Sequence, residues 1–204
     1  MKPFLTRAVV FDIGMVLLRF DFELALRKLK DRCSTKHEEL ASLLWGSGLV
    51  EAYDLGKINT NAFAQQVSRL IEFQGTSQEL IEAWSNIFTP NLPMITRAYR
   101  WKAQGMSLYL LSNTCEAHVE FFTTRYNVFQ IFDGEIYSYH EGVAKPEQAI
   151  FERLLQRYHL DPQTTMFMDD RLENVLAARE LGISAIQYID ECDLAKKLEA
   201  LGLD

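Results

Sequence analysis

Cysteine is scarce in this sequence: Cys33, Cys115 and Cys192 are its three cysteines, and they lie far apart. Because no pair has the CxxC spacing and the number is odd, neither a disulfide framework nor a zinc ribbon is predicted. Long hydrophobic runs are also missing, since none approaches the roughly 18 apolar residues that a transmembrane helix needs. The N-terminal stretch is interrupted by Asp12 and lacks a small-residue cleavage site, which is not typical of a secretory signal. We therefore expect a reduced, soluble, cytoplasmic protein with no membrane partner.

Positive charge is in deficit as well, with 21 Lys and Arg against 28 Asp and Glu, a net charge of −7 and a pI of about 5.2. Such a balance disfavours nucleic acid as a partner. No internal repeat or low-complexity tract is visible, and 48% of the 204 residues are hydrophobic, enough for a substantial core. An anion handled by this protein must therefore be held locally, by backbone donors, a bound cation or a single lysine.

Strand-type apolar runs alternate with helical patterns over most of the chain. The expected strands cover residues 8–11, 107–111, 135–138, 165–168 and 184–188. This alternation is typical of a parallel sheet with helices on both faces. Between about residues 20 and 92 the chain differs, because it contains four helical patterns and no convincing strand.

These patterns predict the α/β class: a Rossmann-like parallel sheet flanked by helices, with a small helical cap inserted after the first strand. The core domain is expected at residues 1–18 and 93–204 and the cap domain at residues 19–92. In such sheets a ligand binds beyond the carboxyl ends of the strands. Polar residues at those ends are therefore the first candidates for a functional site.

Several polar residues meet that criterion. Asp12 follows the first expected strand, Ser112 and Asn113 follow the second, Asp169 and Asp170 end another, and Lys145 precedes a helix in the same half of the chain. Taken singly, each is explained as a turn residue, a helix cap or a surface lysine. Because all of them are expected at one edge of one sheet, a shared site is the better interpretation.

The chemistry available to such a group is specific. Three gathered carboxylates repel one another unless a cation lies among them, and oxygen ligands without His or Cys suit Mg²⁺. A carboxylate at a strand end, such as Asp12, can attack phosphorus and form an aspartyl-phosphate. The Ser112 hydroxyl and the Asn113 amide would bind the phosphoryl oxygens, and the Lys145 ammonium would neutralise the charge that develops there.

Four segments resemble, in order, the motifs of the haloacid dehalogenase (HAD) superfamily, most of whose members are Mg²⁺-dependent phosphatases. They are FDIGMV at residues 11–16, LLSNT at 110–114, AKPEQAIF at 144–151 and FMDDRLEN at 167–174. Motif order, spacing and the helical insert between the first two motifs all agree, over essentially the whole chain. The resemblance implies a phosphatase of small phosphate esters, with a helical cap between the first two motifs.

The resemblance also implies a role for each matching residue. Asp12 corresponds to the nucleophile and a metal ligand, and the backbone carbonyl of Gly14 to a second ligand. Asp170 corresponds to the metal-binding aspartate of the fourth motif. The remaining positions are Ser112 and Asn113 at the phosphate, Lys145 as the lysine of the third motif, and Asp169 and Asn174 in supporting positions near metal-bound waters.

Two residues depart from the usual pattern. Gly14 stands where most phosphatases of the family have a second aspartate as general acid and base. A glycine at this position is typical of a subgroup that resembles α-D-glucose-1-phosphate phosphatases and relatives of the phosphatase half of epoxide hydrolases. That subgroup usually has Asn at the next position, where this chain has Met15. Loss of the acid matters least for a good leaving group, so a sugar-1-phosphate is a candidate substrate.

Other functions remain open. A 2-haloacid dehalogenase of the same superfamily uses an aspartate nucleophile on carbon without a metal, although it usually has an aromatic residue at the position of Gly14. A signalling receiver domain has its acidic pair early in the chain, whereas Asp169 and Asp170 come late. A weakly active HAD-like binding protein would also account for Gly14 and Met15. A monomer or a homodimer is expected.

Some residues are not assigned to the site. Trp45, Tyr53 and Trp84 in the predicted cap are candidates for contact with a sugar, but packing between cap helices explains them at least as well. The histidines His118, His140 and His159 have no ligand spacing, so surface or structural roles are expected for them.

Overall fold

The computed structural model describes residues 6–202; residues 1–5 and 203–204, at the outer ends of the predicted core segments, lie outside the described residues. A five-stranded sheet has the order β5-β4-β1-β6-β7, and each neighbouring pair is parallel. Its strands are β1 (Ala8–Phe11), β4 (Ser107–Ser112), β5 (Gly134–Tyr137), β6 (Thr165–Asp169) and β7 (Ser184–Gln187). The predicted α/β class with a parallel sheet is confirmed.

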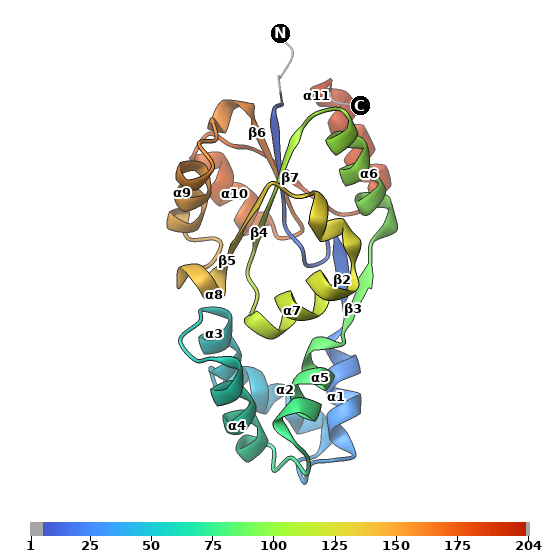
Figure 1. Ribbon diagram of the computed structural model, residues 1–204, viewed down its shortest axis with the longest axis vertical. Helices are drawn as coiled ribbons and strands as arrows, with labels where there is room; N and C mark the ends of the chain where they lie inside the picture. Colours follow the sequence, from blue (N-terminus) through green and yellow to red (C-terminus); the bar gives the residue numbers. More distant parts are fainter. Residues whose placement is uncertain (1–5, 203–204) are drawn as a thin grey trace.

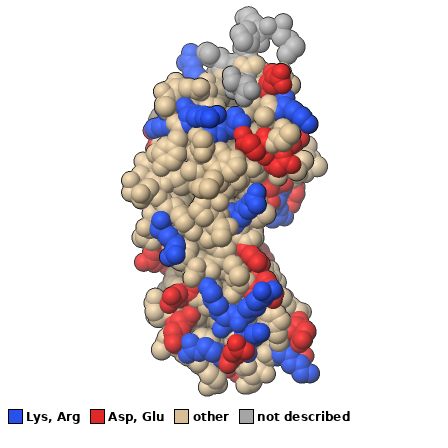
Figure 2. Space-filling view, turned by 90° about the vertical axis from the view of Figure 1, so that its right-hand side faces the viewer, with Lys and Arg blue, Asp and Glu red and all other residues tan. Residues whose placement is uncertain are grey.

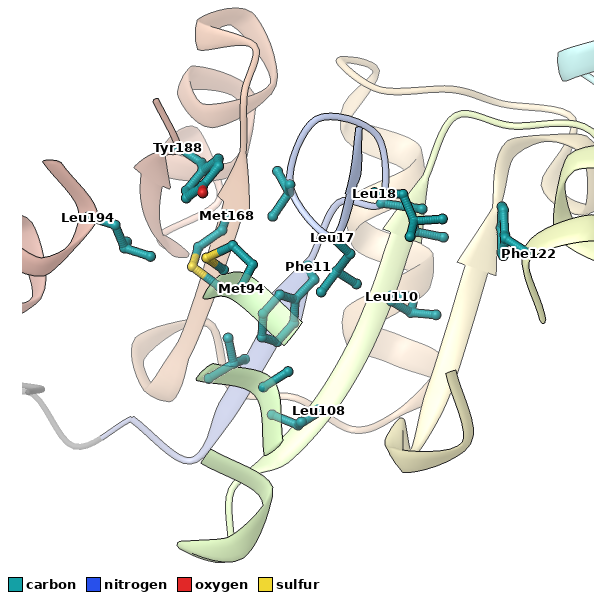
Figure 3. Close-up of a cluster of buried hydrophobic side chains, with 14 of the residues drawn as sticks. Phe11, Leu17, Leu18, Met94, Leu108, Leu110, Phe122, Met168, Tyr188 and Leu194 are labelled. Atoms are coloured by element: carbon teal, nitrogen blue, oxygen red, sulfur yellow. The ribbon is translucent and has the colours of Figure 1, made fainter. Parts of the chain in front are cut away.

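Helices cover both faces of this sheet because the side chains of each strand alternate between two apolar clusters. On β1, Val9 and Phe11 lie in one cluster and Ala8 and Val10 in the other. The first cluster, drawn in Figure 3, is covered by α6 (Leu92–Ala103), α7 (Glu116–Arg125) and α11 (Glu191–Leu201). The second is covered by α9 (Gln148–Arg157) and α10 (Leu172–Glu180). Burial on both faces explains the near-continuous apolar runs of the strands.

The register of the sheet brings the predicted site residues together. Phe11 at the end of β1 is level with Leu110 of β4 and with Met168 of β6. The residue after each of these three therefore lies at the same edge of the sheet. This places Asp12 beside the ends of β4 and β6, as the sequence predicts.

Helices α1 to α5 form the other end of the molecule (Figure 1). They are α1 (Phe22–Lys30), α2 (His37–Gly46), α3 (Leu49–Asp54), α4 (Thr60–Leu70) and α5 (Ser77–Ser85). A third apolar cluster lies among them, and it includes Tyr53 and Trp84, each 1% exposed. Tyr53 and Trp84 are thus packing residues, whereas Trp45 is 42% exposed.

The starts of these helices follow from local hydrogen bonds. Asp21 accepts from Glu23 N–H at the start of α1, and Asn59 accepts from Ala62 N–H at the start of α4. Four of the helices were predicted. The sequence missed α3, because six residues are too few for a helical apolar repeat to show.

The expectation that residues 20–92 contain no strand is wrong. A two-stranded antiparallel sheet, β2 (Leu18–Phe20) with β3 (Phe88–Pro90), joins the helical end to the five-stranded sheet. A strand of three residues is too short to show a detectable alternation of apolar and polar residues. These two strands form because the chain segments that enter and leave the helical end lie side by side. Three short helical segments, η1 (Asn127–Ile131), α8 (Ser138–Glu141) and η2 (Pro162–Thr164), complete the described chain.

Within residues 6–202, no helix has both the length and the apolar character needed to cross a bilayer. On the face drawn in Figure 2, Lys and Arg side chains gather near the upper end and over the helical end, and Asp and Glu side chains lie beside each group.

Candidate active site

Asp12 stands directly after β1, at the start of a tight loop. Its backbone N–H donates to the carbonyl of Met168, 2.9 Å away, and its side chain is buried. The loop closes where the N–H groups of Leu17 and Leu18 both donate to the carbonyl of Ile13. The carbonyl of Gly14 accepts no hydrogen bond within residues 6–202, so it is free to take an external partner. The loop thus holds the Asp12 carboxylate and one free carbonyl close together.

Lys145 connects three of the strand ends. Its Nζ lies 2.8 Å from Asp12 Oδ1 and 2.6 Å from Asp169 Oδ2, and it donates to the carbonyl of Leu111 at 2.8 Å. Burial lowers the pKa of this ammonium, but the charges of Asp12 and Asp169 outweigh that effect, so its pKa is raised. Lys145 is therefore a fixed positive charge in a buried position.

The side-chain amide of Asn113 forms hydrogen bonds with both the carbonyl and the N–H of Lys145. Nδ2 donates to the Lys145 carbonyl and Oδ1 accepts from the Lys145 N–H, each at 2.8 Å. Nδ2 carries a second hydrogen with no partner among residues 6–202, so the expectation that the Asn113 amide binds phosphoryl oxygens stays a prediction. In addition, Asn113 holds the backbone of Lys145. Ser112 is buried beside it, and its Oγ has no hydrogen-bond partner within the described residues.

The carboxylates of Asp12, Asp169 and Asp170 form one cluster, with an oxygen from each lying within 4.8 Å of the others. Asp169 is fully buried, and its Oδ1 accepts from Arg171 N–H and from Asn174 Nδ2, both at 2.9 Å. Together with Lys145, these donors occupy both of its oxygens. Asp170 is less buried and is the carboxylate most available to an external ligand.

Burial is the main reason that the pKa of Asp12 is raised to about 7; Lys145 lowers it, and the neighbouring carboxylates raise it further. Burial likewise raises the pKa of Asp170. A divalent cation would relieve this repulsion. The donor set fits such a cation, because it consists of hard oxygens and because Asn174 Oδ1 is buried without a partner.

The helical end contacts the core beside these residues. Tyr53 Oη accepts from the N–H of Ala117 at 3.0 Å, and the carbonyl of Asp54 accepts from Ser138 Oγ at 2.6 Å. Ser138 Oγ also accepts from the N–H of Thr114, two residues after Ser112. The segment around Asp54 is therefore attached to the loop that follows β4.

Sequence reasoning missed one residue next to Asp12. A Cβ placed on Gly14 would lie 2.9 Å from Cε1 of Phe20 and 4.0 Å from Asp12 Oδ2. The ring of Phe20 thus fills the space beside the carboxylate that a side chain at position 14 would need. No signal in the sequence marks Phe20, because its position depends on the short strand β2.

A model of haloacid dehalogenase-like hydrolases matches residues 6–182. The chain belongs to this family. Its recognition from the four motifs is confirmed, and the chain is an enzyme of the hydrolase class. The family assignment also agrees with the site, where Asp12, Lys145 and the acidic pair at residues 169–170 meet at the carboxyl ends of β1 and β6.

Relatives of this hydrolase span nearly its whole length. It is 24% identical over 200 residues to a sesquiterpene phosphatase of Aspergillus oryzae, covering 96% of each chain. It is also 24% identical over 200 residues to a D-ribitol-5-phosphate phosphatase of Bacteroides thetaiotaomicron, covering 95% of this chain and 97% of the relative. A solved HAD family enzyme of Bacteroides thetaiotaomicron, in complex with magnesium and inorganic phosphate, has a TM-score of 0.82 and 25% identity, covering 93% of this chain and 98% of the other.

Proposed function

We propose that this hydrolase is a Mg²⁺-dependent phosphatase that uses Asp12 to take phosphate from a small phosphate monoester. The observation that carries this proposal is the pairing of Asp12 with Lys145 at 2.8 Å inside a cluster of three carboxylates. A nucleophilic oxygen beside a fixed cation and a candidate metal site is what phosphoryl transfer requires. The names of two relatives and the magnesium and phosphate in a similar enzyme support it.

The metal would be held by the carboxylates of Asp12 and Asp170 and the carbonyl of Gly14, while Asp169 and Asn174 orient bound waters. When bound, Mg²⁺ would offset the repulsion among the carboxylates and the negative charge of the phosphoryl group. The unpartnered Asn174 Oδ1 supports this assignment, since a buried acceptor without a donor is otherwise costly.

In the first proposed step, a carboxylate oxygen of Asp12 attacks phosphorus and the P–O bond to the leaving group breaks. The leaving oxygen keeps the electron pair and takes a proton from water. In the second step, water attacks the aspartyl-phosphate, releasing phosphate and restoring Asp12. Lys145 stabilises the charge on the phosphoryl oxygens throughout, and the free hydroxyl of Ser112 donates to one of them.

The absence of an acid at position 14 limits the substrate. Because the leaving oxygen departs without a proton from the enzyme, a substrate with a good leaving group is favoured, and a sugar-1-phosphate meets this condition. The named substrates of the two relatives, a polyol phosphate and a sesquiterpene, differ widely in polarity, so family membership alone does not choose between them.

We further propose that residues 19–92 act as a cap that closes over Asp12 and excludes water. The contacts of Tyr53 and Asp54 with the core, beside the end of β4, support this role. The hinge of this closing motion would be the two-stranded sheet of β2 and β3, because the chain enters the helical end through β2 and leaves it through β3.

Asp12→Asn tests the proposed chemistry. With Mg²⁺ present we expect the native protein to release phosphate from 4-nitrophenyl phosphate, and the variant to lose at least about a thousandfold in kcat, because the amide cannot attack phosphorus. Asp31→Asn is the matched control: Asp31 is exposed at the end of α1, and its replacement should leave kcat unchanged. Equal activity of the native and Asp12→Asn proteins would contradict the proposal.

Metal removal separates phosphatase from dehalogenase activity. We expect EDTA to abolish phosphate release and added Mg²⁺ to restore it. Release of chloride from 2-chloropropionate in EDTA, without phosphatase activity, would instead identify a dehalogenase. That alternative has one supporting observation, since the Phe20 ring occupies the space beside Asp12 that an aromatic residue at position 14 would fill.

A further inference from the structure

An apolar surface begins directly beside the Asp12 carboxylate. The Phe20 ring faces Gly14, 2.9 Å from where a Cβ would be, and it is 37% exposed. Met15, in the same loop, is 39% exposed. The side of Asp12 next to Phe20 therefore presents apolar groups to an incoming molecule, in place of the carboxylic acid that other phosphatases of this family have there.

The apolar surface continues from the core loop into the helical end. The ring centroids of Phe20 and Phe22 are 5.4 Å apart, and those of Phe22 and Trp45 are 5.1 Å apart. Trp45, on α2, is 42% exposed. Phe20, Phe22 and Trp45 thus form a connected row of rings, here named the apolar strip, that leads from the ring beside Gly14 to α2; the middle ring, Phe22, is partly buried.

The polar side chains next to Phe20 in the chain are partly engaged or point elsewhere. One oxygen of the Asp21 carboxylate, between Phe20 and Phe22, accepts from the N–H of Glu23 as the cap of α1. Arg19 precedes Phe20 in β2, so its side chain points to the opposite side of the strand. The strip offers a sugar or polyol one hydrogen-bonding group, the indole N–H of Trp45. Most hydroxyls of such a molecule would therefore lose hydrogen bonds to water here, whereas an apolar group would not.

Exposure of single apolar side chains is ordinary, but a connected group beside a reactive carboxylate is a sign of ligand binding. We infer that the substrate's leaving group is an apolar phenol that lies along the apolar strip. This inference rests on the proposed phosphatase function. It also agrees with the missing acid, because a phenolate leaves readily without protonation.

A series of 4-alkylphenyl phosphates, from methyl to pentyl, tests the inference with Mg²⁺ present. The leaving-group chemistry is constant in this series and only the apolar length changes. A chain lying on the strip is shielded on one side, so we expect kcat/KM to rise about twofold for each added methylene, less than the roughly fourfold of full burial. Glucose-1-phosphate and D-ribitol-5-phosphate should be poorer substrates than the pentyl compound.

Trp45→Ala and Phe20→Leu should each reduce the ratio of kcat/KM between the pentyl and methyl compounds at least about threefold. Trp45→Gln gives a second test at the outer position if Phe20→Leu lowers the melting temperature strongly. Tyr99→Ala is the matched control, because Tyr99 is an aromatic residue of α6 with 44% exposure, and it should leave this ratio unchanged.

Two failures can be told apart. If phosphate is released but kcat/KM is flat with chain length, or is highest for the polyol phosphates, the inference is overturned and the phosphatase function stands. If no substrate releases phosphate, the affinities of butyl-, hexyl- and octylphosphonate, measured by isothermal titration calorimetry, test whether the strip binds apolar chains. Affinity that rises with chain length and falls in Trp45→Ala supports the inference, and affinity independent of chain length overturns it.

Discussion

At the residue scale, the site depends on a few buried polar contacts that position Lys145. Its ammonium joins Asp12 and Asp169, and its backbone is held on both sides by the amide of Asn113. A long flexible side chain is thereby held in one place, which lowers the cost of ordering it during the reaction. Asn113 thus helps to hold Lys145 in this position.

Replacing Asn113 tests this positioning role. Asn113→Ala removes both bonds, and we expect kcat/KM to fall about 10- to 100-fold, a range typical of supporting residues. Asn113→Asp keeps the acceptor for the Lys145 N–H but loses the donor, so its loss should be smaller. Steady-state kinetics at a temperature where both variants remain folded checks this. Identical rates in Asn113→Ala and the native protein would rule the role out.

At the element scale, helices α1, α4 and α5 of the helical end are stabilised by hydrogen bonds in their first turns. Thr76 accepts from the N–H of Glu79, and Glu79 accepts from the N–H of Thr76, a reciprocal capping box at the start of α5. The carboxylate of Glu79 also pairs with Arg32, which follows α1, at 2.9 Å. One exposed turn thus links the end of α1 to the start of α5.

Thr76→Ala should lower the free energy of unfolding by about 1 kcal/mol, because the N–H of Glu79 loses its acceptor. Gln78→Ala is the control: Gln78 lies in the same turn, is exposed, and has no capping role. Urea titration followed by circular dichroism measures both. A loss in the Gln78→Ala protein as large as that in Thr76→Ala would show that the capping box is not the cause.

Elements differ in how far the sequence predicts them. Strand β1 was predicted because its short apolar run ends at Asp12. Helix α1 was predicted because apolar residues recur at helical spacing directly after its cap, Asp21. Strands β2 and β3 were not, because each is only three residues long and is defined by its partner. The position of Phe20 beside Gly14 was missed for the same reason.

At the scale of the whole molecule, the contact between the helical end and the core contains a titratable group. Burial raises the pKa of Asp54 to about 7, well above its ordinary value of 3.8. The folded protein therefore holds this proton more tightly than the unfolded chain does. By linkage, the contribution of Asp54 to stability falls as the pH rises from about 4 to about 7, and it stays low above that range.

Asp54→Asn removes this pH dependence, because the amide remains neutral. We expect the variant to be more stable than the native protein at pH 8, by on the order of 1–3 kcal/mol, with the difference disappearing near pH 4. Denaturant titrations of both proteins at several pH values, all in EDTA, measure the difference. A constant difference between pH 4 and pH 8 would contradict this assignment.

The sequence by itself determined the sheet, the place of the helical insert and which polar residues end the strands, because apolar periodicity and motif order are local properties of the chain. It did not determine that Asn113 holds the Lys145 backbone or that Phe20 fills the space beside Gly14. Those contacts join segments far apart in the chain, and only the register of β1, β4 and β6 and the pairing of β2 with β3 bring them within a few ångströms of each other.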